Sequence, residues 1–315
     1  METILNKKNY SCFENTIYNL ANLLGTKYQY IFMDSWSFYY NSKPNVPLDE
    51  SLCDNRYLTN SLNDHQATLL SKYHGLSVEW ISTDIANYIS FIHSVRQNNN
   101  VLIVEMDTQH VGWYKLGKIY DVNHYFLILY IDELDDYYCL ESYFSKSLQK
   151  LNFDDIIHIK RIGLVEKTPI KVILPNFNEV TKHAAIACNG ESGTLSDFEM
   201  MKLFANDLTK NDKHKNIYKS DILNSATIAR KLSYIVNGRH NICELLASLE
   251  CSNKKYKSFI IESLNDIILN WQVINNLIIK WLYQNKISIL HTVTNKILEV
   301  SLLEQKLSDD ILSIT

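Results

Sequence analysis

A regular stripe of apolar side chains in the last third of the sequence constrains the fold more than any other feature. Large apolar residues recur there at alternating steps of three and four, at Leu264, Ile267, Trp271, Ile274, Ile278 and Trp281. This spacing puts all six on one face of a helix, which must bury that face against other elements. An aromatic-lined pocket would give a similar pattern, but the core of a helical bundle is the commoner cause. Val293, Ile297 and Val300 extend the prediction to the last helix.

The change from strand-like to helical patterns falls near the middle of the chain. Pro169 and Pro175 bracket the segment PIKVILP, which we expect to be an extended crossover. After it, Ser196 and Glu199 form the capping box that starts a helix over SDFEMMKLFANDL. The chain beyond residue 169 is therefore predicted to be mainly helical.

The first half contains several runs typical of β-strands. Apolar, β-branched and aromatic residues concentrate in NNNVLIVEMDT (98–108) and in HYFLILYIDE (124–133), and DYYCLES (136–142) alternates polar with apolar residues. The short polar stretch DELDD between the last two runs predicts a hairpin. These patterns predict an α+β protein with a first domain at residues 1–168 and a helical second domain at residues 169–315.

Composition and charge narrow the classes of function. Hydrophobic residues make up 46% and charged residues 21% of the chain, which is a globular profile. A formal net charge of −4 argues against nucleic-acid binding, which needs a basic face. The N-terminus lacks the apolar run of a signal peptide, and the most apolar region is interrupted by polar residues. We therefore expect a soluble, cytoplasmic protein with no membrane and no nucleic-acid partner.

The cysteines do not form a recognisable metal motif. The six residues, Cys12, Cys53, Cys139, Cys188, Cys243 and Cys251, contain no CxxC pair and are expected to be reduced thiols. His240 lies close to the last two in sequence, but a structural zinc site normally needs two close ligand pairs. Small buried side chains are the simpler explanation, so we expect no metal.

A second capping box lies near the N-terminus, at Ser11 and Glu14, and it places Cys12 at the first position of a helix. Gly25 supplies the C-terminal stop of that helix. The positive end of the helix dipole favours the thiolate form of the cysteine, which is the reactive nucleophile. A buried, inert cysteine is the alternative reading, and it is common.

A nucleophilic thiolate needs an imidazole partner, and the imidazole needs a group that orients it. His124 opens the strand at 124–133, where its side chain can reach a neighbouring helix terminus. Glu141 lies on the next predicted strand, roughly across the hairpin from His124. The chain thus contains a candidate set of Cys12, His124 and Glu141.

These residues also resemble a known arrangement. A cysteine at the start of the first long helix, a later strand that begins with histidine, and an acidic residue on the following strand resemble papain-like cysteine enzymes. The stretch from 101 to 133 resembles more closely the butirosin-acyltransferase family, with Asp107, Tyr114 and His124 in the matching order. The segments SDFEMMKLFANDL and VNGRHNICELLASLE resemble that family's helical domain. The resemblance implies a papain-like catalytic domain followed by a helical domain.

The resemblance implies acyl transfer rather than proteolysis. Members of the family take an acyl group from the phosphopantetheine thioester of an acyl or peptidyl carrier protein and pass it to an amine in antibiotic biosynthesis. The implied acceptor is a small amine or diamine, and no cofactor is implied in the enzyme itself. Cys12 then corresponds to the nucleophile and His124 to the base, and Glu141 stands where the family usually has Asp.

The resemblance also implies roles for residues around this set. Papain-like enzymes place a Gln six residues before the cysteine as an oxyanion donor, and the residue here is the shorter Asn6. Trp113, Tyr114 and Asp107 precede the histidine on a loop where substrate would approach. Asp107 either holds a substrate ammonium or caps the end of its strand, and capping is the preferred reading.

Two other functions stay open from the sequence. A cysteine peptidase or amidase would use the same three residues, because hydrolysis and aminolysis both pass through an acyl-cysteine. A non-catalytic binding or scaffold protein would keep the fold without the chemistry. Acyl transfer from a carrier protein to an amine is the preferred prediction.

Overall fold

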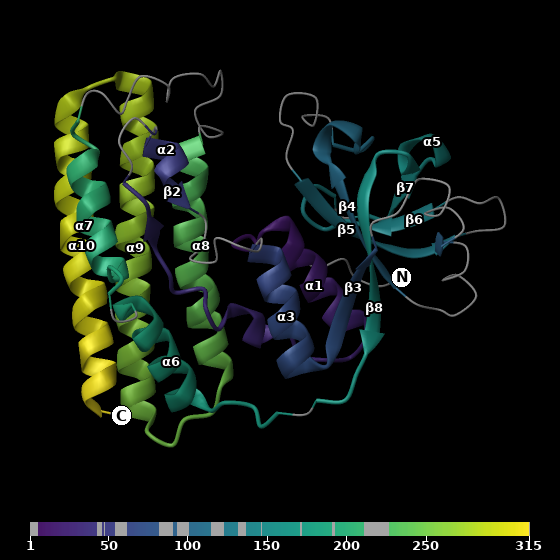
Figure 1. Cartoon of the computed structure of the whole chain (residues 1–315), viewed down its shortest axis with the longest axis horizontal. Coiled ribbons are helices and arrows are strands. Elements are labelled where there is room, and N and C mark those ends of the chain that lie inside the picture. The colour runs from purple at the N-terminus through teal and green to yellow at the C-terminus, as the bar shows by residue number, and fades with distance from the viewer. Residues whose placement is uncertain are drawn as a thin grey trace. The chain divides into compact units, whose positions relative to one another are not determined.

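A computed structural model divides the chain into two compact units (Figure 1). The first contains residues 1–31 and 63–173, and the second contains residues 32–62 and 174–315. Within them the structure describes residues 6–42, 46, 48–53, 62–81, 91–92, 101–114, 123–131, 137–145, 147–170, 172–190, 193–210 and 227–314. The chain is a mixed α+β protein, as the sequence patterns predict.

The first unit is built on an antiparallel sheet with strand order β3-β8-β4-β5-β6-β7. Its strands are β3 (Leu76–Ile81), β4 (Leu102–Asp107), β5 (Asn123–Ile131), β6 (Tyr137–Leu140), β7 (Gln149–Leu151) and β8 (Ile159–Lys167). β4, β5 and β6 are the strands expected from the sequence, and the β5–β6 pairing confirms the hairpin. β3, β7 and β8 were not predicted: β7 has only three residues and β8 lacks a regular alternation, whereas the alternation of LSVEWI in β3 was a usable signal.

Helices α1 (Cys12–Leu23) and α3 (Leu62–His74) lie together beside this sheet (Figure 1). Phe13, Ile17 and Leu20 are buried on the inner face of α1. Short helical turns complete the described part of the unit: η1 (Gln29–Phe32), η2 (Thr108–His110) and α5 (Phe153–Ile156). Because α1 contacts β5, the start of α1 and the start of β5 come together.

The second unit is a helical bundle. Its helices are α6 (Phe177–Asn189), α7 (Asp197–Asp207), α8 (Thr227–Ser248), α9 (Lys254–Gln284) and α10 (Ile287–Ile314). All six residues of the apolar stripe lie on α9 and are at most 2% exposed, which confirms the bundle-core reading. The capping box at Ser196 is also confirmed, since its hydroxyl accepts from the Glu199 amide at 3.2 Å.

The helical unit also includes residues 32–62, which the sequence patterns place in the first domain. This segment contains β1 (Tyr39–Tyr40), α2 (Leu48–Ser51) and β2 (Leu52–Cys53). A single boundary at residue 168 therefore does not describe the two units. After residue 31 the chain contributes residues 32–62 to the helical unit, and it then returns to the first unit with α3.

Buried carboxylates of the bundle hold segment 32–62 in place. Asp197 accepts from the Phe38 amide at 2.8 Å, and Asp207 accepts from the Tyr40 hydroxyl at 2.6 Å. A carboxylate removed from water needs such donors, because its desolvation is otherwise uncompensated. Hydrophobic periodicity does not reveal these contacts, because they join residues more than 150 positions apart.

Glu304 on α10 is a further buried carboxylate of the bundle, with an exposed fraction of 0%. It accepts from the indole of Trp36 at 2.8 Å and from the indole of Trp271 at 2.6 Å. Arg239 on α8 donates Nε and Nη2 to the same carboxylate, at 3.1 and 2.9 Å. The carboxylate therefore joins the three bundle helices α8, α9 and α10 to segment 32–62.

No helix in the described ranges combines the length and the apolar character needed to cross a bilayer.

Replacing Glu304 by Gln is expected to lower the free energy of unfolding by about 3–5 kcal/mol, because it leaves the Arg239 charge buried without its partner. Urea denaturation would measure the loss as a fall in the midpoint at constant slope. The matched control is Glu299→Gln, which breaks the largely exposed pair with Lys296 at 3.6 Å and is expected to change stability by less than about 1 kcal/mol. Equal effects for the two variants would contradict the role of the Glu304 network.

His74 at the end of α3 should set part of the acid sensitivity of the first unit. Its Nε2 accepts from the Tyr30 amide at 3.0 Å, which requires a neutral ring. Burial, and then the charge of Lys27, lower its pKa from 6.5 to about 4. Because the unfolded chain binds this proton first, the contribution is complete above about pH 6.5 and is lost as pH falls toward 4.

We expect His74→Asn to flatten the dependence of unfolding free energy on pH between 6.5 and 4. Denaturant titrations at half-unit steps would measure the slope. Thr68→Ala, at an exposed position of the same helix, is the control, because it removes no titratable group and should keep the wild-type slope. A His74→Asn protein whose slope equals that of the wild type would contradict this role.

Candidate active site

Cys12 is the first residue of α1, as the sequence predicts. The capping box is present in both directions: the Glu14 amide donates to the Ser11 hydroxyl at 3.2 Å, and the Ser11 amide donates to the Glu14 carboxylate at 2.7 Å. Gln66 on α3 donates to the other carboxylate oxygen of Glu14 at 2.9 Å. These bonds fix where the helix starts, and hence where the half-buried thiol lies.

Polar side chains on the inner face of α1 attach it to β5 and to the preceding loop. Thr16 donates its hydroxyl to the carbonyl of Cys12 at 2.8 Å and lies 3.0 Å from the carbonyl of Tyr125. Asn15 accepts from the Lys7 amide at 2.9 Å. The helix therefore meets the strand next to His124, and the Cys12 sulfur lies 3.8 Å from the carbonyl of Asn123.

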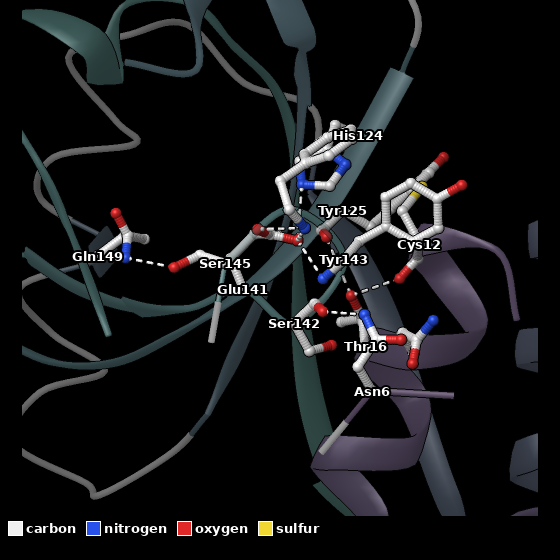
Figure 2. A network of polar contacts seen from close by, with 12 residues as sticks. Asn6, Cys12, Thr16, His124, Tyr125, Glu141, Ser142, Tyr143, Ser145 and Gln149 are labelled. Carbon is white, nitrogen blue, oxygen red and sulfur yellow. Dashed lines mark hydrogen bonds and ion pairs between the residues drawn. The ribbon is translucent and has the colours of Figure 1, made fainter. Parts of the chain in front are cut away.

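His124 is the second residue of β5 and is only 1% exposed. Its Nε2 lies 3.3 Å from Oε1 of Glu141, which is an ion-pair distance. The contact does not meet the geometry of a hydrogen bond. The opposite side of the ring faces Cys12 (Figure 2). The structure thus brings together Cys12, His124 and Glu141, with the imidazole between the other two.

Glu141 directly follows β6 and is buried with its carboxylate. The β5–β6 register pairs Leu127 with Leu140, so the position of Glu141 lies two residues along from that of His124 on the same face of the sheet. The carboxylate accepts from the Tyr143 amide at 2.6 Å and from the Phe144 amide at 3.0 and 2.9 Å. A glutamate has the length to reach both its own turn and the imidazole.

The environment of His124 favours its charged form. Burial acts to lower its pKa, but the interactions with Cys12 and then with Glu141 outweigh burial and raise the pKa from 6.5 to about 9. A charged imidazole is stabilised on one side by the Glu141 carboxylate, and on the other side the ring faces the thiol of Cys12. This geometry is suited to a thiolate–imidazolium pair at the start of a helix, which stays a prediction.

The end of α1 is also suited to stabilising developing negative charge. The first amides of a helix have no carbonyl partner within it, and here they belong to Cys12 and Phe13. A carbonyl attacked by the sulfur would place its oxygen near these donors. The arrangement can thus supply a nucleophile, a proton carrier and at least part of an oxyanion site.

Asn6 does not point its amide at the sulfur. Its Nδ2 donates to the main-chain carbonyl of Ser142, next to Glu141 (Figure 2). Asn19 on α1 donates to the hydroxyl of the same serine at 3.0 Å. The described contact of Asn6 positions the loop after β6, and its role as an oxyanion donor stays a prediction.

Asp107 forms an ion pair with Lys160 at 2.6 Å, and Lys160 also donates to the side chain of Asn123 at 2.7 Å. Asp107 is the last residue of β4 and makes no side-chain capping hydrogen bond to η2, so its role as a cap of the strand end stays a prediction. Because Lys160 compensates the charge of Asp107, the Asp107 carboxylate is poorly suited to hold a substrate ammonium.

The two aromatic residues of the same loop lie near the histidine. Tyr114 stacks on Phe144 with ring centroids 3.7 Å apart, and Phe144 lies 4.6 Å from the His124 ring. Trp113 packs edge-on against Phe126 and the core. Tyr114 therefore belongs to an aromatic group beside the site, whereas Trp113 mainly supports the sheet. Their substrate-positioning roles stay predictions.

No cluster of three metal-binding side chains occurs within the described ranges. His240 instead lies 3.2 Å from Gln272, and Cys243 lies 3.9 Å from Asn265. No sequence motif points to Thr16, Gln66 and Tyr143, which position or adjoin the three central residues. The one sequence signal for Thr16 is that polar residues lie on the inner face of α1. A purely structural helix would have apolar residues there.

Iodoacetamide alkylation across pH 5–9 would test the thiolate–imidazolium pair. We expect Cys12 to react at least tenfold faster at pH 6.5 than Cys243 and Cys251, which are also half-buried. Replacing His124 by Ala should remove this advantage at pH 6.5, because the imidazolium no longer stabilises the thiolate. Peptide mass mapping would follow each thiol separately, and equal rates for the three cysteines would contradict the pair.

Comparisons with known proteins do not place the chain in a family. No protein-family model matches it, and no curated protein is significantly similar to it. The resemblance to butirosin-type acyltransferases therefore stays a proposal, and it depends on the geometry of the site.

Proposed function

We propose that the protein is a cysteine-dependent acyltransferase with a papain-like first unit, related to the butirosin-acyltransferase family. The observation that carries the proposal is the assembly of Cys12, His124 and Glu141, with a buried imidazole between a helix-start thiol and a buried carboxylate. A purely structural role for this set is disfavoured, because it leaves a charged imidazole enclosed at a thiol that is partly open to solvent.

In the first step the Cys12 thiolate attacks the carbonyl carbon of an acyl thioester. The new S–C bond forms as the carbonyl becomes an oxyanion beside the first amides of α1. The oxyanion then collapses and expels the donor thiolate, which takes its proton from His124. The acyl group stays on Cys12, and the imidazole is left neutral.

In the second step an amine attacks the acyl-cysteine. His124, now neutral, accepts the proton of the attacking nitrogen, while Glu141 stabilises the imidazolium that forms. Collapse of the second oxyanion expels the Cys12 thiolate and releases an amide. The amide is more stable than either thioester, so this step drives the transfer. We propose that the donor is the phosphopantetheine thioester of a carrier protein and that the acceptor is a small amine or diamine, in the biosynthesis of a peptide-like antibiotic.

Hydrolysis is the second candidate, because the partly open thiol gives water access to the same acyl-cysteine. The two reactions differ only in the second nucleophile. Product analysis with and without an amine therefore separates them.

The test uses N-acetylcysteamine thioesters of short acids, which reproduce the end of phosphopantetheine, with or without a short diamine. We expect acyl-Cys12 to accumulate without amine and the amide to form when amine is present. Cys12→Ala should abolish both, and Glu141→Gln should slow amide formation by about 10²-fold, because the neutral amide stabilises the imidazolium less well. Intact mass and product chromatography would measure these steps.

Cys243→Ala is the matched control, since it removes another half-buried thiol and should leave the rates unchanged. Formation of the free acid alone at every amine concentration would favour the hydrolase. Full activity in Cys12→Ala would contradict both enzymes.

A further inference from the structure

The loop after β6 carries a tyrosine that the three-residue mechanism does not use. Tyr143 is two residues beyond Glu141, and its own amide is held by the Glu141 carboxylate at 2.6 Å. Ser142, the residue before it, is held from α1 by Asn19 and from the N-terminal segment by Asn6. The backbone of Tyr143 is therefore fixed by the same carboxylate that orients His124.

The side chain of Tyr143 lies beside the nucleophile. Figure 2 shows Tyr143 next to Cys12, and its ring centroid is 6.4 Å from that of His124. The residue is 46% exposed, in contrast to the enclosed His124 and Glu141. An incoming carbonyl must approach Cys12 from an open side, and Tyr143 stands on such a side.

The phenol stays a hydrogen-bond donor in this position. Burial of its hydroxyl, and then the charge on Cys12, raise the pKa of Tyr143 above its ordinary value of 10. A neutral phenol near the reacting carbon can donate to negative charge that forms there.

We propose that the Tyr143 hydroxyl donates a hydrogen bond to the oxyanion formed when Cys12 attacks a carbonyl, together with the amides at the start of α1. Tyr143 thus takes the part that the sequence suggests for Asn6, whose Nδ2 donates to the Ser142 carbonyl. The inference deepens the proposed function and rests on an acyl-Cys12 intermediate. Tyr143 itself forms and breaks no covalent bond.

Two reagents separate this role from others. p-Nitrophenyl acetate acylates Cys12 through an oxyanion, with release of p-nitrophenolate. Iodoacetamide alkylates the same sulfur by displacing iodide and forms no oxyanion. The ratio of the two second-order rate constants therefore reports oxyanion stabilisation and cancels changes in thiolate content or access to the sulfur.

We expect Tyr143→Phe to lower this ratio by about 10²-fold, with the alkylation rate within threefold of wild type. Tyr18→Phe is the matched control, because it removes a phenolic oxygen from α1 two turns beyond Cys12 and should leave both rates unchanged. Stopped-flow detection of p-nitrophenolate and mass mapping of alkylated Cys12 provide the two rates. The alkylation rate also reports whether the variant remains folded around the site.

A fall of less than tenfold in the ratio would overturn the proposal, whether both rates stay high or both decline in parallel. Failure of p-nitrophenyl acetate to acylate Cys12 in the wild type would overturn it as well. The proposed function is judged separately with thioester and amine. A lowered ratio in Tyr143→Phe, with no amide formed by the wild type, would support the role of Tyr143 and contradict the acyltransferase. An unchanged ratio, with amide formed by the wild type, would contradict the role of Tyr143 and support the acyltransferase.

Discussion

A buried carboxylate that must find donors is the constraint on which the site depends. Glu141 lies at the end of β6, out of water, and it accepts from the amides of its own turn while pairing with His124. Removing a carboxylate from solvent is unfavourable unless such partners are present. The partners it recruits are the backbone of the next loop and the imidazole. One carboxylate thus contacts the imidazole ring and holds the backbone of Tyr143.

The helical unit applies the same constraint to its architecture. Glu304 gathers two indoles and an arginine around one carboxylate, and Asp197 and Asp207 bind the backbone and a phenol of segment 32–62. Gly238 on α8 contributes by leaving room, since a Cβ there would lie 2.5 Å from the carbonyl of Ser35. Apolar burial on α9 stabilises the bundle, whereas these polar contacts decide which segment crosses it.

In the first unit, three elements support the candidate pair of Cys12 and His124. In the proposed charged state of this pair, the start of α1 and the imidazole would both stabilise a thiolate, and Glu141 would stabilise the imidazolium in turn. None of these elements has this effect alone, because a helix end by itself shifts a thiol only modestly and an enclosed imidazole by itself stays neutral. Thr16 is therefore important although it takes no part in the proposed reaction, because its contact with the Tyr125 carbonyl brings the helix to the strand.

Local signals in the sequence determined a large part of this protein: the start of α1 at Cys12, the capping box of α7, the β5–β6 hairpin and the buried stripe of α9. Each depends on spacing within a few residues, so periodicity and capping chemistry are sufficient to predict it. The choice of Cys12, His124 and Glu141 also followed from position within such elements. Only the tertiary structure decided that segment 32–62 belongs with the helices and that Lys160 pairs with Asp107. It also decided that Asn6 binds the Ser142 carbonyl and that Tyr143 lies next to Cys12. These contacts join residues far apart in the chain, and they satisfy charges and hydrogen bonds that burial would otherwise leave without partners, a requirement that no local pattern encodes.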